Sequence, residues 1–217
     1  MGFTIKDFLN LDIIKGAIVK TYSDTIERKP IDTISVTELP VENFVHKNEL
    51  VLSTCIGCEK DTKVFIDFVK AIYQSGASAL VVSTGGYVKK TPQEVIDYAN
   101  ELGFPIIEIP WEIRFAGIIE SVLAELNNIK QDNAKRFENL QKKLLTLFLN
   151  GSTLSEAAEL IRQELGNQAV IVNSLGTIKG TSKYADELLN ILEPPLKILS
   201  TGYEEMATFA RIFQAIR

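Results

Sequence analysis

The sequence predicts an α/β fold: a small, mainly parallel sheet flanked by helices, followed by a long, coiled-coil-like helix and a partial α+β segment. Three observations predict it. Short β-branched or apolar runs alternate with helical patterns between residues 17 and 110, and apolar residues spaced three and four apart replace them after Trp111. Residues 169–180 then have the pattern of two strands joined by a turn. We therefore expect three regions, residues 1–112, 113–150 and 151–217.

The N-terminal elements are short. Residues 4–10 predict a helix with Thr4 as its N-cap, because a threonine side chain there accepts a hydrogen bond from an otherwise unpaired backbone N–H. Residues 17–21 predict a short strand. Residues 33–37 alternate polar and apolar side chains, as a strand with one solvent-facing side does, and Pro40 ends it because proline cannot continue a strand ladder.

A β-α-β-α-β succession follows. Strands and amphipathic helices are predicted in the order 50–53, 61–74, 79–83, 92–103 and 104–109. The run at 79–83 is almost continuously apolar, which is typical of a strand covered on both faces. This order predicts parallel strands joined by right-handed crossovers.

A long helix is predicted after Trp111. Its apolar stripe comprises Phe115, Ile119, Val122, Leu126, Ile129, Phe137, Leu140, Leu144 and Leu147. Asn133 occupies the missing step of the stripe, which there resembles a stutter in a heptad repeat. A helix of ~35 residues is about 50 Å long and needs a partner along its stripe, and we expect a second copy of the chain to supply it.

The C-terminal region begins where Asn150-Gly151 ends the long helix. Ser152 or Thr153 is expected to cap a further helix that reaches Gly166. The strand, turn and return strand at 169–180 then form the opening hairpin of a small domain.

Composition excludes several classes of protein. Apolar residues make up 46% and charged residues 24%, as in ordinary globular proteins rather than disordered chains. The net charge of −5 and the pI near 5.1 do not fit a basic nucleic-acid-binding domain. We find neither a membrane-spanning run nor a secretory signal, and with two cysteines we expect a cytoplasmic protein.

Six sequence elements occur in order between residues 3 and 112. They are FTIKDFL at 3–9, ISVTELP at 34–40, NELVLST at 48–54, GASAL at 76–80, LGFP at 102–105 and IPWE at 109–112. No single element is specific, but the ordered set resembles the N-terminal domain of the PucR family, bacterial regulators of purine catabolism. The long helix followed by a hairpin also resembles the layout of that family.

The resemblance implies the signal-input part of a transcriptional regulator of purine or nitrogen catabolism. Residues 1–112 would be a ligand-sensing domain for a small nitrogenous metabolite, the helix at 113–149 would form a homodimer, and 151–217 would begin a GAF-like sensory segment. Family members carry a helix-turn-helix at the far C-terminus, and we find none here. We therefore expect no DNA contact except through a C-terminal region absent here, no membrane contact, and a chain that is truncated or a short natural product.

The candidate ligand site lies where the predicted parallel strands end, because ligands of open α/β sheets bind beyond the carboxyl ends of the strands. The residues expected there are Glu38, Ser53, Thr54, Thr84, Gly85, Gly86, Tyr87 and Trp111. Tyr87 or Trp111 would stack on a planar metabolite, and the hydroxyl groups and glycine amides would bind its polar atoms. In the alternative interpretation, Glu38 and Thr54 satisfy backbone groups of their loops, and Trp111 packs beneath the long helix.

Other chemistry is less well supported by the sequence. Cys55 and Cys58 have C-x-x-C spacing, which fits either a redox pair or chance placement in a loop. With His46 as the one histidine and no third cysteine, a thiolate-rich zinc site cannot form within one chain. We expect His46 to be an exposed turn residue, and we expect no metal and no cofactor. Two alternative functions stay open: a purely structural dimerisation or docking module without its own ligand, and an enzyme, for which no catalytic constellation is assembled.

Overall fold

The computed structural model describes residues 2–21, 28–174, 176–185 and 188. The chain forms two compact units, Met1–Gln131 and Asp132–Arg217. No helix in the described ranges combines the length and the apolar character that crossing a bilayer requires.

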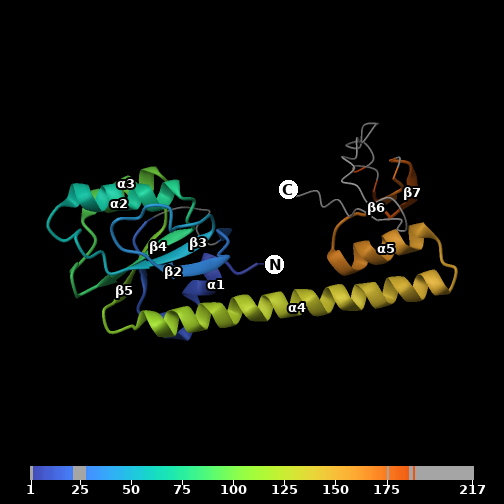
Figure 1. Cartoon of the computed structure of the whole chain (residues 1–217), viewed down its shortest axis with the longest axis horizontal. Helices are drawn as coiled ribbons and strands as arrows, with labels where there is room; N and C mark the ends of the chain where they lie inside the picture. Colours follow the sequence, from blue (N-terminus) through green and yellow to red (C-terminus); the bar gives the residue numbers. More distant parts are fainter. Residues whose placement is uncertain (1, 22–27, 175, 186–187, 189–217) are drawn as a thin grey trace. The chain divides into compact units, whose positions relative to one another are not determined.

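The first unit is built on a five-stranded sheet with the strand order β1-β5-β4-β3-β2 (Figure 1). The strands are β1 (Ile18–Val19), β2 (Thr33–Val36), β3 (Glu49–Ser53), β4 (Ala79–Thr84) and β5 (Ile106–Pro110). β2 to β5 run parallel, and β1 pairs antiparallel with β5. The predicted small, mainly parallel sheet is confirmed, although β1 is shorter than the predicted strand at 17–21.

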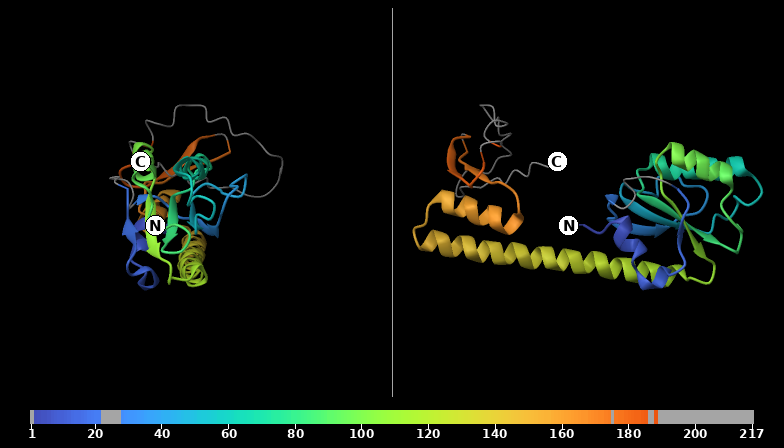
Figure 2. Two further views of the ribbon diagram at one scale, coloured as in Figure 1. Left: turned by 90° about the vertical axis from the view of Figure 1, so that its left-hand side faces the viewer. Right: turned by 180° about the vertical axis from the view of Figure 1, so that it is seen from behind.

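Helices cover both faces of this sheet (Figures 1 and 2). α2 (Thr62–Gln74) and α3 (Gln93–Glu101) lie on one face. α1 (Ile5–Leu9) lies on the other face with the first part of α4 (Phe115–Leu149). The predicted N-cap of α1 is confirmed, because the Thr4 hydroxyl and the Asp7 carboxylate form a reciprocal capping box. A short 3₁₀ helix at Asp12–Ile14 was not predicted.

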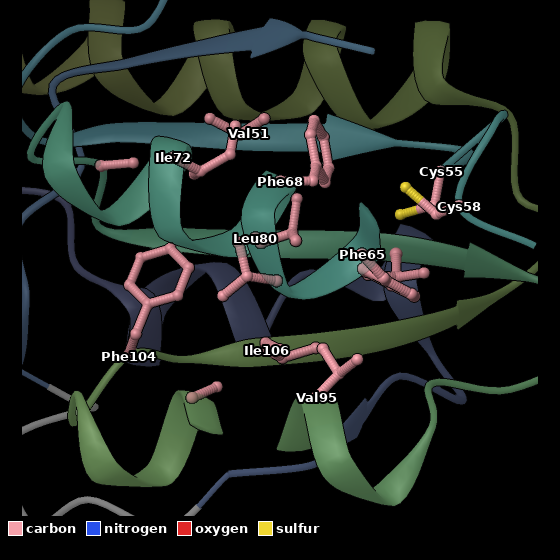
Figure 3. Close-up of a cluster of buried hydrophobic side chains, with 14 of the residues drawn as sticks. Val51, Cys55, Cys58, Phe65, Phe68, Ile72, Leu80, Val95, Phe104 and Ile106 are labelled. Carbon is pink, nitrogen blue, oxygen red and sulfur yellow. The ribbon is translucent and has the colours of Figure 1, made fainter. Parts of the chain in front are cut away.

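Two apolar cores result, one on each side of the sheet. The core under α2 and α3 contains Phe65, Phe68 and Phe104, which Figure 3 shows packed around Leu80 and Ile106. Successive residues of a strand point to opposite faces, so the next residues along the strands belong to the second core. The near-continuous apolar character of the central strands follows from this coverage of both faces.

The second core contains the first turns of α4. Ile118, Val122 and Leu126 are buried there, and Phe115, Ile119 and Ile129 pack against it. This changes the expectation that the apolar stripe of the long helix needs a second copy, because the chain's own sheet covers the stripe from residue 115 to 129. The first compact unit therefore runs to Gln131, beyond the boundary that we expected at residue 112.

The second unit contains the remainder of α4, α5 (Leu154–Leu165) and a hairpin of β6 (Val170–Val172) and β7 (Ile178–Thr181). Thr153 caps α5 with a capping box, as one of the two predicted caps. Leu140 and Leu144 of the predicted stripe pack in the core of this unit, with residues of α5 and β6. The rest of the predicted sensory segment, from 189 to 217, lies outside the described residues.

Candidate functional site

The predicted site residues lie at the carboxyl ends of β2 to β5 and form two groups. Glu38, Ser53 and Thr54 form one group after β2 and β3, which we call the Glu38 clasp. Gly85, Gly86, Tyr87 and Trp111 form the other after β4 and β5, which we call the aromatic platform. Parallel strands lie about 4.8 Å apart, so two strand spacings of about 10 Å separate the groups along one edge of the sheet.

The Glu38 clasp is a closed set of hydrogen bonds. The Ser53 hydroxyl donates to Glu38 Oε2 over 2.7 Å, and the Thr54 backbone N–H and hydroxyl each donate to Oε1 over 2.7 Å. The Ile56 N–H also donates to Oε2, over 3.3 Å. Both carboxylate oxygens are therefore occupied by donors from the end of β3 and the loop after it. Glu38 accordingly fixes this loop to the loop after β2.

The aromatic platform is an exposed pair of rings. Tyr87 and Trp111 meet edge to face, with ring centroids 5.7 Å apart and an interplanar angle of 81°. Tyr87 is 50% exposed and Trp111 is 44% exposed. Each ring therefore packs on the protein with part of its surface and presents the remainder to solvent.

Glycine at residue 86 is required by the close approach of the indole. A Cβ atom there would lie 2.3 Å from Cε3 and Cζ3 of Trp111. Gly85 has φ +106°, which favours glycine, and its N–H donates to the Val88 carbonyl oxygen over 2.9 Å, closing the turn that carries Tyr87. The turn at Gly85 and Gly86 thus allows the two rings to meet.

Thr84 connects the platform to the sheet rather than to the clasp. It pairs with Pro110 in the register of β4 and β5, and its hydroxyl donates to the Ile109 carbonyl oxygen over 3.3 Å. Because Thr84 precedes Gly85 and Pro110 precedes Trp111, this register places the Gly-Gly turn beside the indole.

Glu108 is one of two buried glutamates of the sheet, with Glu49, and the sequence analysis missed both as buried groups. Glu108 of β5 is 8% exposed, accepts the Thr91 N–H over 2.6 Å and lies 3.5 Å from Lys20 Nζ. The sequence signal for Glu108 was a single carboxylate within the otherwise apolar strand β5. The contacts of Glu108 explain it as a structural tie between β5, β1 and the loop before α3.

The remaining predicted groups are placed as follows. His46 is exposed in its turn, as expected. Cys55 and Cys58 are both free thiols and both buried. No group of three or more His, Cys, Asp or Glu side chains suited to a metal ion occurs within the part of the chain that the structure describes.

Comparison with known proteins places the first unit in a family. Residues 7–126 match the family described as purine catabolism regulatory protein-like, PucR. The chain is similar to the purine catabolism regulatory protein of Bacillus subtilis (strain 168), with 24% identity over 127 residues. That match covers 58% of this chain but 24% of the relative, so the chain spans about a quarter of the relative's length. No solved structure matches. Since the family match covers more than half of the chain, the predicted resemblance is confirmed, and the chain belongs to the purine catabolism regulatory protein-like family.

Proposed function

We propose that the chain is the signal-input part of a transcriptional regulator of purine or nitrogen catabolism. In this proposal the first unit binds a small, planar, nitrogenous metabolite, and the chain forms a homodimer through α4. Membership of the family and the name of the Bacillus subtilis relative support the regulatory role. DNA would be bound by a helix-turn-helix region outside these 217 residues.

The observation that carries the ligand-binding proposal is the exposed platform of Tyr87 and Trp111 at the carboxyl edge of the sheet. A flat heterocycle or ureide would stack on the exposed ring surface, which has a large apolar area and a fixed orientation. A purely structural role predicts that both rings are packed inside. Their exposures of 50% and 44% favour the ligand site instead.

The Glu38 clasp would contribute to metabolite binding mainly by fixing the shape of the carboxyl edge of the sheet. Ser53 is fully buried, and its hydroxyl both donates to Glu38 and accepts the Cys55 N–H. Thr54 is half-buried, and its hydroxyl oxygen keeps acceptor capacity after donating to Glu38. In this proposal an N–H group of the metabolite donates to Thr54 while its ring stacks on the platform.

The experiment that tests ligand binding uses the single tryptophan as its probe. Because Trp111 is the only tryptophan in the chain, its emission reports directly on the platform. Purines and ureides are titrated against the chain while emission and thermal midpoint are followed, and we expect at least one compound to change both. Trp111→Ala should abolish the thermal shift, whereas Phe44→Ala, at a residue 67% exposed elsewhere on the first unit, should keep it. Compounds at saturation that change neither signal would contradict the proposal.

Dimerisation is supported by a second apolar face of α4 that the described residues leave exposed. Phe137 is 56% exposed, and Leu145 and Phe148 are 58% and 79% exposed. Phe137 and Phe148 lie about three helical turns apart on the same side of α4, with Leu145 beside them. A parallel second copy would present the same face, so the surface is complementary to itself.

Light scattering after size exclusion tests this part separately. The chain should run as a dimer, and Phe148→Glu should shift it to a monomer by placing a charge in the interface. Asn139→Glu provides the matched control, because nine residues of α-helix place Asn139 opposite Phe148. A chain that is monomeric at high concentration would refute the dimer and leave the ligand site untouched.

A further inference from the structure

Two cysteine thiols lie side by side at the turn that follows β3. Figure 3 shows the sulfur atoms of Cys55 and Cys58 next to each other, and both residues belong to the core that α2 covers. The Cys55 thiol donates a hydrogen bond to Cys58, which lowers the pKa of the Cys58 thiol. The same hydrogen bond and burial hold the pKa of the Cys55 thiol well above its ordinary value. The two groups are therefore paired, with Cys58 the more easily ionised.

The backbone of this turn already suits a bond between the two sulfur atoms. The Cys58 N–H donates to the Cys55 carbonyl oxygen over 3.0 Å and closes a four-residue turn. Gly57, its third residue, has φ +90°, as a type II turn requires. Such a turn holds its first and last Cα atoms within about 7 Å. Disulfides span Cα separations of about 4.4–6.8 Å.

We infer that Cys55 and Cys58 form a thiol–disulfide site, which low-molecular-weight disulfides such as oxidised glutathione convert to an intramolecular disulfide. The Cys58 thiolate attacks one sulfur of glutathione disulfide, and the released glutathione thiolate takes up a proton. Cys55 then gives up its proton, and its sulfur attacks the Cys58 sulfur of the mixed disulfide. The second glutathione leaves with that proton, so two protein thiols are oxidised and one glutathione disulfide is reduced to two thiols.

Access to the thiols depends on the turn and not on the sheet. Ile56 and Gly57 are exposed at its tip, whereas Cys55 and Cys58 are 1% and 3% exposed beneath it. Reagents therefore reach the sulfur atoms when the turn opens locally. The Glu38 clasp restrains that opening, because Glu38 accepts the Ile56 N–H and the Ser53 hydroxyl accepts the Cys55 N–H. The inference thus links the oxidation state of the thiols to one half of the sheet edge, although it does not depend on the proposed ligand.

The test uses the wild-type chain in buffers of reduced and oxidised glutathione. After equilibration, free thiols are alkylated and the chain is digested with trypsin, which releases residues 48–60 with both cysteines in one peptide. In oxidising buffer we expect this peptide to lack two hydrogen atoms and to carry no alkyl group. In reducing buffer it should carry two. Cys55→Ser should accumulate a glutathione adduct on Cys58, because it cannot close the second step. Cys58→Ser lacks the thiolate that makes the first attack, and it should form an adduct much more slowly.

Three results would overturn the inference. The first is a peptide that remains doubly alkylated in fully oxidised glutathione. The second is a wild-type chain that stops at a glutathione adduct. The third is an oxidation rate that follows global unfolding. If the turn opens locally, the rate should change little with urea below the unfolding transition. If only the unfolded chain is oxidised, the rate should rise steeply with urea.

Discussion

Replacing Gly86 by alanine should force the Trp111 indole away from the edge of the sheet. The added Cβ would lie 2.3 Å from two ring carbons and 2.6 Å from a third, closer than non-bonded carbon atoms approach. The backbone of Gly86 is not among the left-handed residues of the chain. The expected effect therefore comes from contact with the ring and not from backbone strain.

The size of the effect follows from the exposure of the indole. Trp111 is 44% exposed, so somewhat more than half of its surface is buried and could be lost to solvent. A tryptophan that buries ~200 Å² when fully covered would here bury about 110 Å². At about 25 cal/mol per Å², complete loss of this contact would cost about 3 kcal/mol. Because the displaced ring keeps part of its contact, we expect Gly86→Ala to lower the free energy of unfolding by about 1–2 kcal/mol.

Urea unfolding followed by circular dichroism measures this cost, and tryptophan emission measures the displacement. The emission of Gly86→Ala should move to longer wavelength and become more accessible to acrylamide. Gly2→Ala is the control, because nothing lies within 4 Å of the Cβ it adds. In a Trp111→Ala background the substitution at residue 86 should cost almost nothing. An equal cost in both backgrounds, or an unchanged emission, would refute the packing that we describe.

The remaining predictions concern the clasp, the two packed parts of the chain and pH. Glu38→Gln should destabilise the first unit by about 1–3 kcal/mol in urea unfolding. The amide nitrogen of glutamine would replace one carboxylate oxygen, so the groups that donate to this oxygen would lose their acceptor. Ile118→Ala should cost about 2–5 kcal/mol, whereas Phe137→Ala should cost the isolated chain little; equal costs would contradict the placement of α4 in the second core. Arg162 and a backbone N–H lower the pKa of Glu159 to about 2. The contribution of ionised Glu159 to the free energy of unfolding is therefore complete above pH 4.5 and is lost as the pH falls through about 2. Glu159→Gln should remove this part of the pH dependence of the free energy of unfolding.

Local patterns in the sequence were sufficient to predict most elements of the fold. The β-α-β-α-β succession was predictable because each strand and helix has its own periodicity. The helix α4 was predictable because an apolar stripe with one break at Asn133 runs from Phe115 to Leu147. The partners of α4 were not predictable in the same way. Whether Val122 packs on the chain's own sheet or on another copy depends on tertiary contacts, which spacing alone does not encode.

The same distinction applies to the candidate site. The rule on strand ends selected Glu38 and Ser53, and the parallel register of β2 and β3 brings them within 2.7 Å. That they bind each other could not be predicted, because the pairing depends on the paths of two loops. Trp111 was expected either to stack on a ligand or to pack beneath the long helix. Its ring lies against Gly86 and part of it is exposed, so stacking on a ligand stays a prediction.

The position of Trp111 in the chain gives the proposed signal a physical route. Only three residues separate it from Phe115, the first residue of α4, and the Ile113 N–H donates to the Pro110 carbonyl oxygen over 3.1 Å in the connecting turn. A metabolite that stacks on Trp111 would therefore act on a ring joined through one tight turn to the N-terminus of α4. Binding can shift α4 only if the metabolite has different affinities for two arrangements of this turn. Gly86 bears on this difference, because its lack of a side chain is what lets the indole pack so closely against the turn. If Gly86→Ala changed metabolite affinity but not the environment of α4 in the proposed dimer, ligand recognition would remain and this route would be refuted.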